Sequence, residues 1–167
     1  TFQGKGVFPE SHPLFLWPGF GAAAPAFARS VAGDCDATLA IGCRFGEVAT
    51  GSYGVRPPSP LIHVDIDPSV PGRNFPTDLA FACDAAEFVR ALLPLLSGRS
   101  THAGLRELIR AGRAEAAVEI QSPSASGVSP GRLLKHLQEL FGPDTIYTTD
   151  SGNGTFLALE GLTLDQP

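Results

Sequence analysis

A glycine-rich turn in the last part of the sequence has the residue types that suit phosphate binding. Residues 150–154 read Asp-Ser-Gly-Asn-Gly, after the β-branched run at 145–149 and before a helix expected from residue 155. A turn of this kind presents backbone N–H groups at a helix N-terminus, where phosphate binds well. An ordinary tight turn is the alternative, because the G-x-G-x-x-G and P-loop patterns are both absent.

A second set of polar residues follows three short apolar runs. Arg44, Asp65 and Asp84 each stand at the end of such a run. Ligands of open α/β sheets bind beyond the carboxyl ends of the strands, where an acidic residue can bind ribose hydroxyls and an arginine a phosphate. The structural alternatives are that Arg44 pairs with Glu47 or Asp67, and that Asp84 only caps the helix that follows it.

The sequence contains no motif typical of a metal site or of a catalytic nucleophile. The four histidines show no metal-ligand spacing, G-x-S-x-G is absent, and His63 lies inside an apolar run, which favours a core histidine. The three cysteines, Cys35, Cys43 and Cys83, form no C-x-x-C pair. They are predicted to be buried reduced thiols, which indicates a cytoplasmic protein.

The composition restricts the class of protein. The chain has 167 residues, 43% of them apolar and 17% charged, with a net charge of −5. These values predict a folded domain, or one domain with part of another, and they exclude a disordered chain. Clustered basic residues and long apolar runs are both missing, so neither nucleic acid nor a membrane is an expected partner. Because methionine is absent, we expect a processed chain or a piece of a longer one.

The elements that would position these residues are typical of an α/β fold. Continuous apolar runs predict parallel strands buried on both faces at 37–42, 61–65 and 79–83. Helices are expected at 22–31, 85–96, 101–119, 130–141 and from 155 onward. The pattern predicts a Rossmann-like parallel sheet flanked by helices in residues 1–98. A linker with a helix at 99–128 and an incomplete second α/β unit at 129–167 follow.

Four stretches, in this order, resemble one enzyme family. They are GKGVFPESHPL at 4–14, LAIGCRF at 39–45 with Thr50-Gly51, IHVDIDP at 62–68 with Gly72-x-Asn74, and TTDSG at 148–152. Together they resemble the acetolactate-synthase-type enzymes that depend on thiamine diphosphate. The resemblance covers nearly the whole chain.

The resemblance implies a domain assignment. Residues 1–98 would be the central, FAD/NAD-binding-like domain without its first βα unit, and residues 129–167 the beginning of the diphosphate-binding domain. The family's activating glutamate and its Gly-Asp-Gly … Asn metal motif would lie outside these residues. No catalytic residue and no metal ligand is therefore expected in this chain, and the chain alone is expected to be inactive.

The resemblance also implies cofactor-binding positions. The positions that match the family's thiamine diphosphate turn are Ser151, Gly152, Asn153 and Gly154, although the family often has Val-Gly-Gln there. In members that carry FAD, the matching positions are Gly42, Arg44, Phe45, Asp65, Ile66 and Asp84. Other members bind ADP or nothing at the central domain.

The activity implied for the parent enzyme is decarboxylation of a 2-oxo acid, followed by addition to a second carbonyl. Thiamine diphosphate and Mg²⁺ would be its cofactors, and a homo-oligomer, dimer or tetramer, is expected. Two other interpretations stay open. The chain could be a stand-alone module that binds a nucleotide such as ADP or FAD, or a structural domain that serves assembly.

Overall fold

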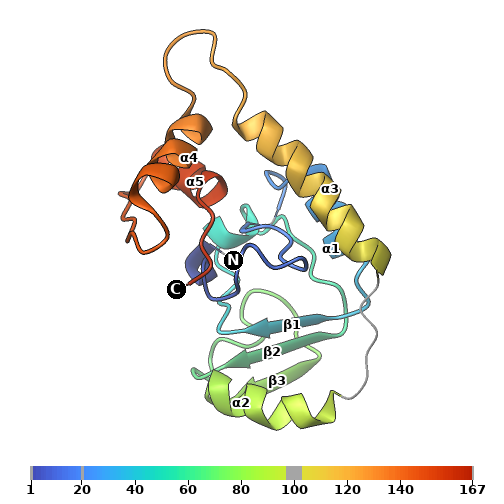
Figure 1. Cartoon of the computed structure of the whole chain (residues 1–167). Coiled ribbons are helices and arrows are strands. Elements are labelled where there is room, and N and C mark those ends of the chain that lie inside the picture. Colours follow the sequence, from blue (N-terminus) through green and yellow to red (C-terminus); the bar gives the residue numbers. More distant parts are fainter. Residues whose placement is uncertain (1, 20, 97–102, 167) are drawn as a thin grey trace. The chain divides into compact units, whose positions relative to one another are not determined.

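The computed structural model describes residues 2–19, 21–96 and 103–166 (Figure 1). The chain divides into two compact units. One is formed by Gly19–Ala103, and the other by Phe2–Pro18 together with Gly104–Pro167. Residues 2–18 therefore fold with the C-terminal part of the chain, although they precede the sheet in sequence.

The first unit is built on a parallel sheet of three strands. β1 (Thr38–Ile41), β2 (Leu61–Asp65) and β3 (Leu79–Ala82) lie in the order β1-β2-β3. Both pairings are parallel, with Ala40 opposite His63 and His63 opposite Ala80. The prediction of a parallel α/β sheet flanked by helices is confirmed, and the bounds of β2 match the sequence prediction residue for residue.

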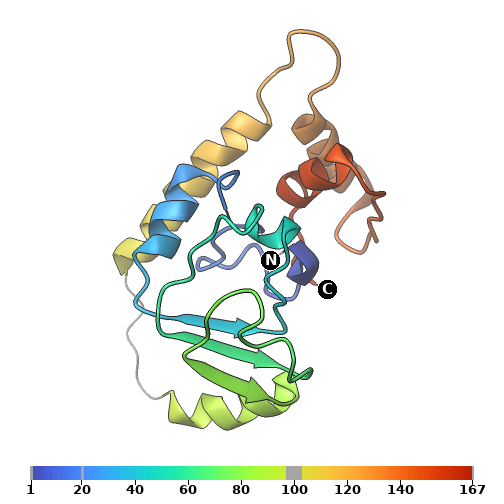
Figure 2. The ribbon, with the colours of Figure 1, turned by 180° about the vertical axis from the view of Figure 1, so that it is seen from behind.

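Burial in the sheet differs from the prediction of strands covered on both faces. That prediction holds for β2, whose residues are buried or half-buried. It is wrong for the outer strands, where Leu39 is 44% and Phe81 41% exposed. α2 (Ala85–Leu92) packs on one face of the sheet, on the side of β3 (Figures 1 and 2). The ring centroids of Phe81 in β3 and Phe88 in α2 lie 5.1 Å apart.

Prolines set the limits of the helices in the first unit. α1 (Ala26–Gly33) begins directly after Pro25, which takes the N-cap position, so the helix starts four residues later than predicted. α2 ends at Leu92 and continues as a short 3₁₀ turn at Leu93–Leu95. Pro94 lacks the N–H group that a longer α-helix would use, which explains why the helix predicted at 85–96 is shorter. A second 3₁₀ turn occupies Val48–Thr50.

The second unit is helical in the residues that the structure describes. α3 (Ala103–Ile120), α4 (Pro130–Phe141) and α5 (Asn153–Gly161) agree with the predicted helices, and a 3₁₀ turn lies at Phe2–Gly4. Residues 101 and 102, where α3 was expected to begin, lie outside the described residues.

The strand predicted at residues 145–149 does not form in the structure. This stretch is irregular, and Ile146 in it is 89% exposed. A strand needs a neighbour to pair with its N–H and C=O groups. None of the described residues of the second unit forms a strand that could serve as this neighbour.

A buried ion pair ties residues 2–18 to the end of the second unit. The Lys5 ammonium donates to the Glu10 carboxylate at 2.7 Å and to the Leu162 carbonyl at 2.7 Å. The backbone of Glu10 and Leu164 is joined by an N–H to carbonyl bond of 3.1 Å. Arg113 of α3 donates to the Glu10 carbonyl at 2.6 Å. These contacts hold an irregular segment in one conformation without a sheet.

Candidate functional site

The carboxyl ends of the three strands form one edge of the sheet. The Gly42 N–H donates to the Val64 carbonyl at 2.8 Å, and the Cys83 N–H donates to the Asp65 carbonyl at 3.1 Å. The ladder therefore continues one residue beyond β1 and beyond β3. The structure brings Gly42, Asp65 and the start of α2 to the same edge, as the order of apolar runs predicted.

Two aspartates organise the turn after β2. Asp65 is 9% exposed, and its Oδ1 accepts the Asp67 N–H at 3.0 Å. The Oδ1 of Asp67 accepts the Ser69 hydroxyl at 2.7 Å and the Ser69 N–H at 2.9 Å. The bond from the Ser69 hydroxyl, then that from its N–H, lowers the pKa of Asp67, and the charges of Arg73 and Arg44 act in the same direction. Both carboxylates are therefore fixed by backbone donors.

Arg44 presents an exposed guanidinium at this edge. In the part of the chain that the structure describes, no carboxylate lies within 4 Å of it, so it forms no direct ion pair with Glu47 or Asp67. Its carbonyl accepts the Asn74 side-chain N–H at 2.9 Å, which joins the loop after β1 to the loop after β2. An exposed cationic side chain without an ion-pair partner, at the carboxyl end of a parallel sheet, suits a phosphate-bearing ligand.

Arg73 is a charged residue of this edge that the sequence did not reveal. It lies close enough to Asp67 to lower the pKa of that carboxyl. The Gly72-x-Asn74 pattern marked the positions on either side of it, but nothing in the pattern singled out the residue between them. Only the fold of this loop brings Arg73 to the side of Asp67.

The side chain of Phe45 belongs to the core. Phe45 is 9% exposed and packs with Ala40 and Leu61. Its ring centroid lies 5.3 Å from that of His63, edge to face. His63 is 2% exposed and donates from Nε2 to the Cys43 carbonyl at 2.8 Å, which confirms its place in the core. The prediction of a fully hydrogen-bonded histidine is wrong, because its buried Nδ1 has no partner among the described residues. Phe45 would thus face a ligand only through its backbone.

Ile66 and Asp84 complete the predicted set at this edge. Ile66 is 74% exposed, so its side chain is open to contact. Asp84 is the N-cap of α2, because its Oδ1 accepts the N–H groups of Ala86 at 2.9 Å and Glu87 at 3.0 Å. The capping interpretation of Asp84 is confirmed.

The glycine-rich turn lies in the second unit, at the N-terminus of α5. Gly152 takes the N-cap position with a φ of +138°, and the helix begins at Asn153, two residues before the predicted start. The Ser151 N–H donates to the Asp150 carboxylate at 2.7 Å. The N–H groups of Asn153 and Gly154 lie in the first helical turn, where α-helix geometry provides no internal acceptor.

The cysteines are free, but their burial differs from the prediction. Cys43 and Cys83 are half-buried, whereas Cys35 is exposed. Cys35 follows the end of α1, and its Sγ donates to the Val31 carbonyl at 3.3 Å. Among the described residues, no three His, Cys, Asp or Glu side chains lie together as a possible metal site. No described helix has the length and hydropathy to cross a membrane.

Comparison with known proteins places the sequence in a family. The model of the thiamine pyrophosphate enzyme central domain matches residues 1–92. A probable acetolactate synthase large subunit of Methanocaldococcus jannaschii is 32% identical over 162 residues, covering 91% of this chain and 27% of that protein. The acetolactate synthase large subunit of Porphyra purpurea is 31% identical over 158 residues, with 91% and 26% covered.

A third relative extends the match to the whole chain. The acetolactate synthase of Mycobacterium bovis is 27% identical over 177 residues, covering 100% of this chain and 28% of that protein. The chain spans about a quarter of the length of the curated relatives it matches. A family model that matches more than half of the chain and relatives that cover nearly all of it lead to one conclusion: the chain belongs to the thiamine pyrophosphate enzyme family and carries its central domain.

Proposed function

We propose that the chain is part of a thiamine-diphosphate-dependent enzyme of the acetolactate synthase type. The parent enzyme would decarboxylate a 2-oxo acid such as pyruvate and join the remaining fragment to a second carbonyl compound. This proposal rests on the names of the relatives, which align with the chain over 158 to 177 residues. Residues 1–98 would be the central domain, 99–128 a linker with α3, and 129–167 the start of the diphosphate-binding domain.

The turn before α5 fits the phosphates of thiamine diphosphate. The backbone N–H groups of Asn153 and Gly154 point out of a helix N-terminus, and Gly152 at φ +138° lets the chain enter the helix sharply. Ser151 is exposed and completes the turn. When bound, thiamine diphosphate supplies the electron sink for decarboxylation. In this proposal the turn only binds and orients its phosphates. Mg²⁺ is the expected partner ion, and no residue of this chain is proposed as its ligand.

The sheet edge fits a nucleotide such as ADP or the ADP part of FAD. Arg44 would bind a phosphate, and the Asp65 carboxylate would accept hydrogen bonds from ribose hydroxyls. Gly42, with φ +60°, has no side chain, so a ligand could approach the backbone at the end of β1. The exposed side chain of Ile66 would give the nucleotide an apolar contact. Phe45 would contact it through its backbone. Asp84 would contact it through the carboxylate oxygen that does not cap α2.

The decisive experiment uses the complete reading frame that contains residues 1–167. The purified product would be incubated with pyruvate, thiamine diphosphate and Mg²⁺, and acetolactate would be measured. Formation that depends on both cofactors supports the proposal. Pyruvate decarboxylation without a carbon–carbon bond-forming step would overturn the assignment to the acetolactate synthase type. We expect the 167-residue chain by itself to be inactive in the same assay.

A nucleotide-binding module is the second candidate function, favoured by the exposed guanidinium of Arg44 at the same sheet edge as Asp65. Saturable binding of ADP or FAD by the 167-residue chain supports it, and a flat titration contradicts it. We further propose that the parent enzyme is a cytoplasmic homo-oligomer, a dimer or tetramer. Sedimentation of the full-length product tests the assembly, and fluorescence of a tagged copy in the cell tests the compartment.

A further inference from the structure

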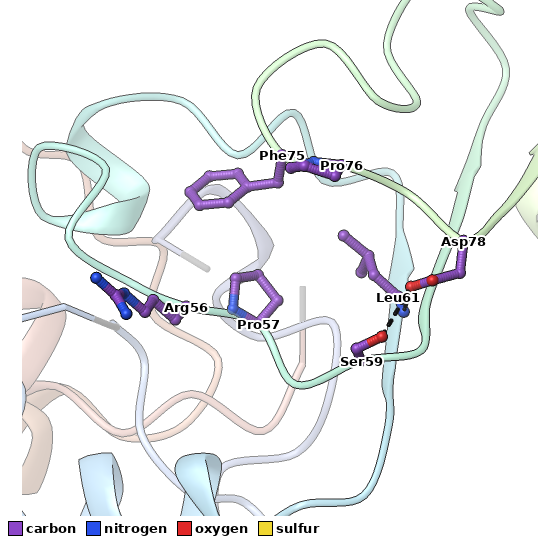
Figure 3. A pocket seen from close by; sticks show the side chains of 7 residues that line it. All are labelled: Arg56, Pro57, Ser59, Leu61, Phe75, Pro76 and Asp78. Atoms are coloured by element: carbon purple, nitrogen blue, oxygen red, sulfur yellow. Dashed lines mark hydrogen bonds between the residues drawn. The ribbon is translucent and has the colours of Figure 1, made fainter.

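A cavity lies at the opposite end of β2 from Asp65. It has a volume of about 330 Å³ and sits at the amino ends of β2 and β3 (Figure 3). Its lining combines one guanidinium and one carboxylate with apolar walls: Arg56, Pro57, Ser59, Leu61, Phe75, Pro76 and Asp78. This volume falls at the lower end of the range for small-molecule sites.

The carboxylate of Asp78 is fixed at one end of this cavity. Its Oδ2 accepts the N–H of Leu61, the first residue of β2, at 2.6 Å, and the Ser59 hydroxyl at 3.2 Å. The backbone N–H of Asp78 donates to the Leu61 carbonyl at 3.0 Å. Oδ1 of Asp78 has no hydrogen-bond partner among the described residues. A carboxylate that is held by its other oxygen is a preorganised acceptor for a ligand.

Arg56 supplies a positive charge at the other end. Figure 3 shows Arg56 and Asp78 at opposite ends of the row of lining residues, with Pro57 and Phe75 between them. The Arg56 side chain forms no hydrogen bond or ion pair with any described residue. An exposed guanidinium without a partner among the described residues is available to bind an anion.

The apolar wall between the two charges is packed against the core. The ring of Phe75 lies 5.2 Å from that of Phe45, which is buried in the core, and Leu61 is 3% exposed. Pro57 adds a ring without rotatable side-chain bonds. Flat apolar surfaces of this kind suit the face of an aromatic ligand, because little side-chain freedom is lost on binding.

We propose that this cavity binds a small planar acid, an aromatic monocarboxylate with a hydroxyl or amino donor opposite its carboxylate. The carboxylate pairs with Arg56, the ring packs against Pro57 and Phe75, and the distal donor bonds to Oδ1 of Asp78. A polyanion such as ADP is disfavoured, because the Asp78 carboxylate would repel it. The site is therefore separate in place and in ligand chemistry from the proposed nucleotide edge.

The test is an NMR titration of the ¹⁵N-labelled chain with 4-hydroxybenzoate. We expect saturable shifts of the amides of Arg56, Leu61 and Asp78, without shifts at Arg44 and Asp65. Benzoate, which lacks the distal donor, should bind about tenfold more weakly. Benzylamine, a cation of similar size, should not bind at this cavity.

A pair of variants separates binding from folding. Arg56→Gln removes a charge that forms no hydrogen bond or ion pair with a described residue, so the NMR spectrum should remain that of a folded chain. The affinity for 4-hydroxybenzoate should fall about tenfold or more. Arg90→Gln, in the last turn of α2, is the matched exposed control and should leave the affinity unchanged. Equal affinity in Arg56→Gln and the parent chain, or no saturation at millimolar ligand, would overturn the proposal.

Discussion

The ammonium of Lys5 lies 2.7 Å from the carboxylate of Glu10, and the two side chains are only 8% and 4% exposed. The second carboxylate oxygen of Glu10 accepts the Leu164 N–H at 3.1 Å. Burial lowers the pKa of Lys5, and the hydrogen bond and charge of Glu10 oppose that shift. This pair and its backbone partners hold the GKGVFPE part of the family pattern against the end of the chain.

Removal of one partner of this pair should destabilise the second unit strongly. Glu10→Gln leaves the Lys5 ammonium buried without its counter-charge, and we expect a loss of about 3 kcal/mol in the free energy of unfolding. Urea denaturation followed by circular dichroism measures it. The control is Glu139→Gln, which removes an exposed pair with Lys135 and should cost less than about 0.5 kcal/mol. Equal losses in the two variants would contradict the structural role of the buried pair.

The stability of the second unit should fall as the pH rises above 4.5, through the ionisation of Glu160. Burial raises the pKa of this carboxyl above its ordinary value of 4.5, and a hydrogen bond from Trp17 opposes the shift. A group that holds its proton more tightly in the folded chain stabilises that chain below 4.5 and loses this contribution as the pH rises through the folded pKa.

Glu160→Gln should therefore flatten this part of the stability profile. Thermal unfolding of the two chains across mildly acidic to neutral pH measures the difference. The melting temperature of the variant should equal or exceed that of the parent chain at neutral pH. A parent chain that gains stability between pH 4.5 and neutrality, relative to the variant, would show that the sign is wrong.

The close approach of α4 to the end of α3 should make Gly131 intolerant of a side chain. A Cβ at Gly131 would overlap the carbonyl oxygen and the side chain of Ile120. Because the overlap involves backbone, Gly131→Ala should lower stability by about 1–3 kcal/mol. Gly104→Ala is the matched control, since Gly104 is also the second residue of a helix and has open space around it. This control should gain about 0.5 kcal/mol.

The sheet edge should bind ADP through charge. Arg44→Gln should weaken ADP binding by the 167-residue chain about tenfold, because a charge-assisted contact to phosphate is lost. Asp65→Asn should weaken it less, since an amide oxygen still accepts the Asp67 N–H and one ribose hydroxyl. Isothermal titration measures both affinities, and Arg90→Gln on α2 serves as the control. An unchanged affinity in Arg44→Gln would remove Arg44 from the proposed site.

Features that depend on neighbouring residues in the sequence were predicted well. β2 has the predicted bounds because an apolar run is delimited by Pro60 and by the acidic turn after Asp65. The N-cap of α2 followed from Asp84 alone, because a cap needs only the next two or three backbone N–H groups. The carboxyl edge of the sheet followed from the order of the runs, since parallel strands end on one side.

Features that depend on distant partners could not be predicted in the same way. The β-branched run around Ile146 has strand propensity, but a strand also needs a paired neighbour. The exposure of Leu39 depends on which elements cover the sheet, and the position of Arg73 depends on the fold of a loop. The contacts of Lys5 join residues separated by 157 positions, a relationship that no local pattern contains.

That separation has a consequence for synthesis on the ribosome. Lys5 and Glu10 are translated more than 150 residues before their backbone partners at Leu162 and Leu164. At translation rates of 5–20 residues per second, the early segment waits roughly 10–30 s for its partners. The strands of the sheet lie within 45 residues of one another, from Thr38 to Ala82, and can pair during that interval. The sheet of the first unit can therefore form before the second unit is complete, and we expect the charges of Lys5 and Glu10 to stay hydrated until their partners are translated.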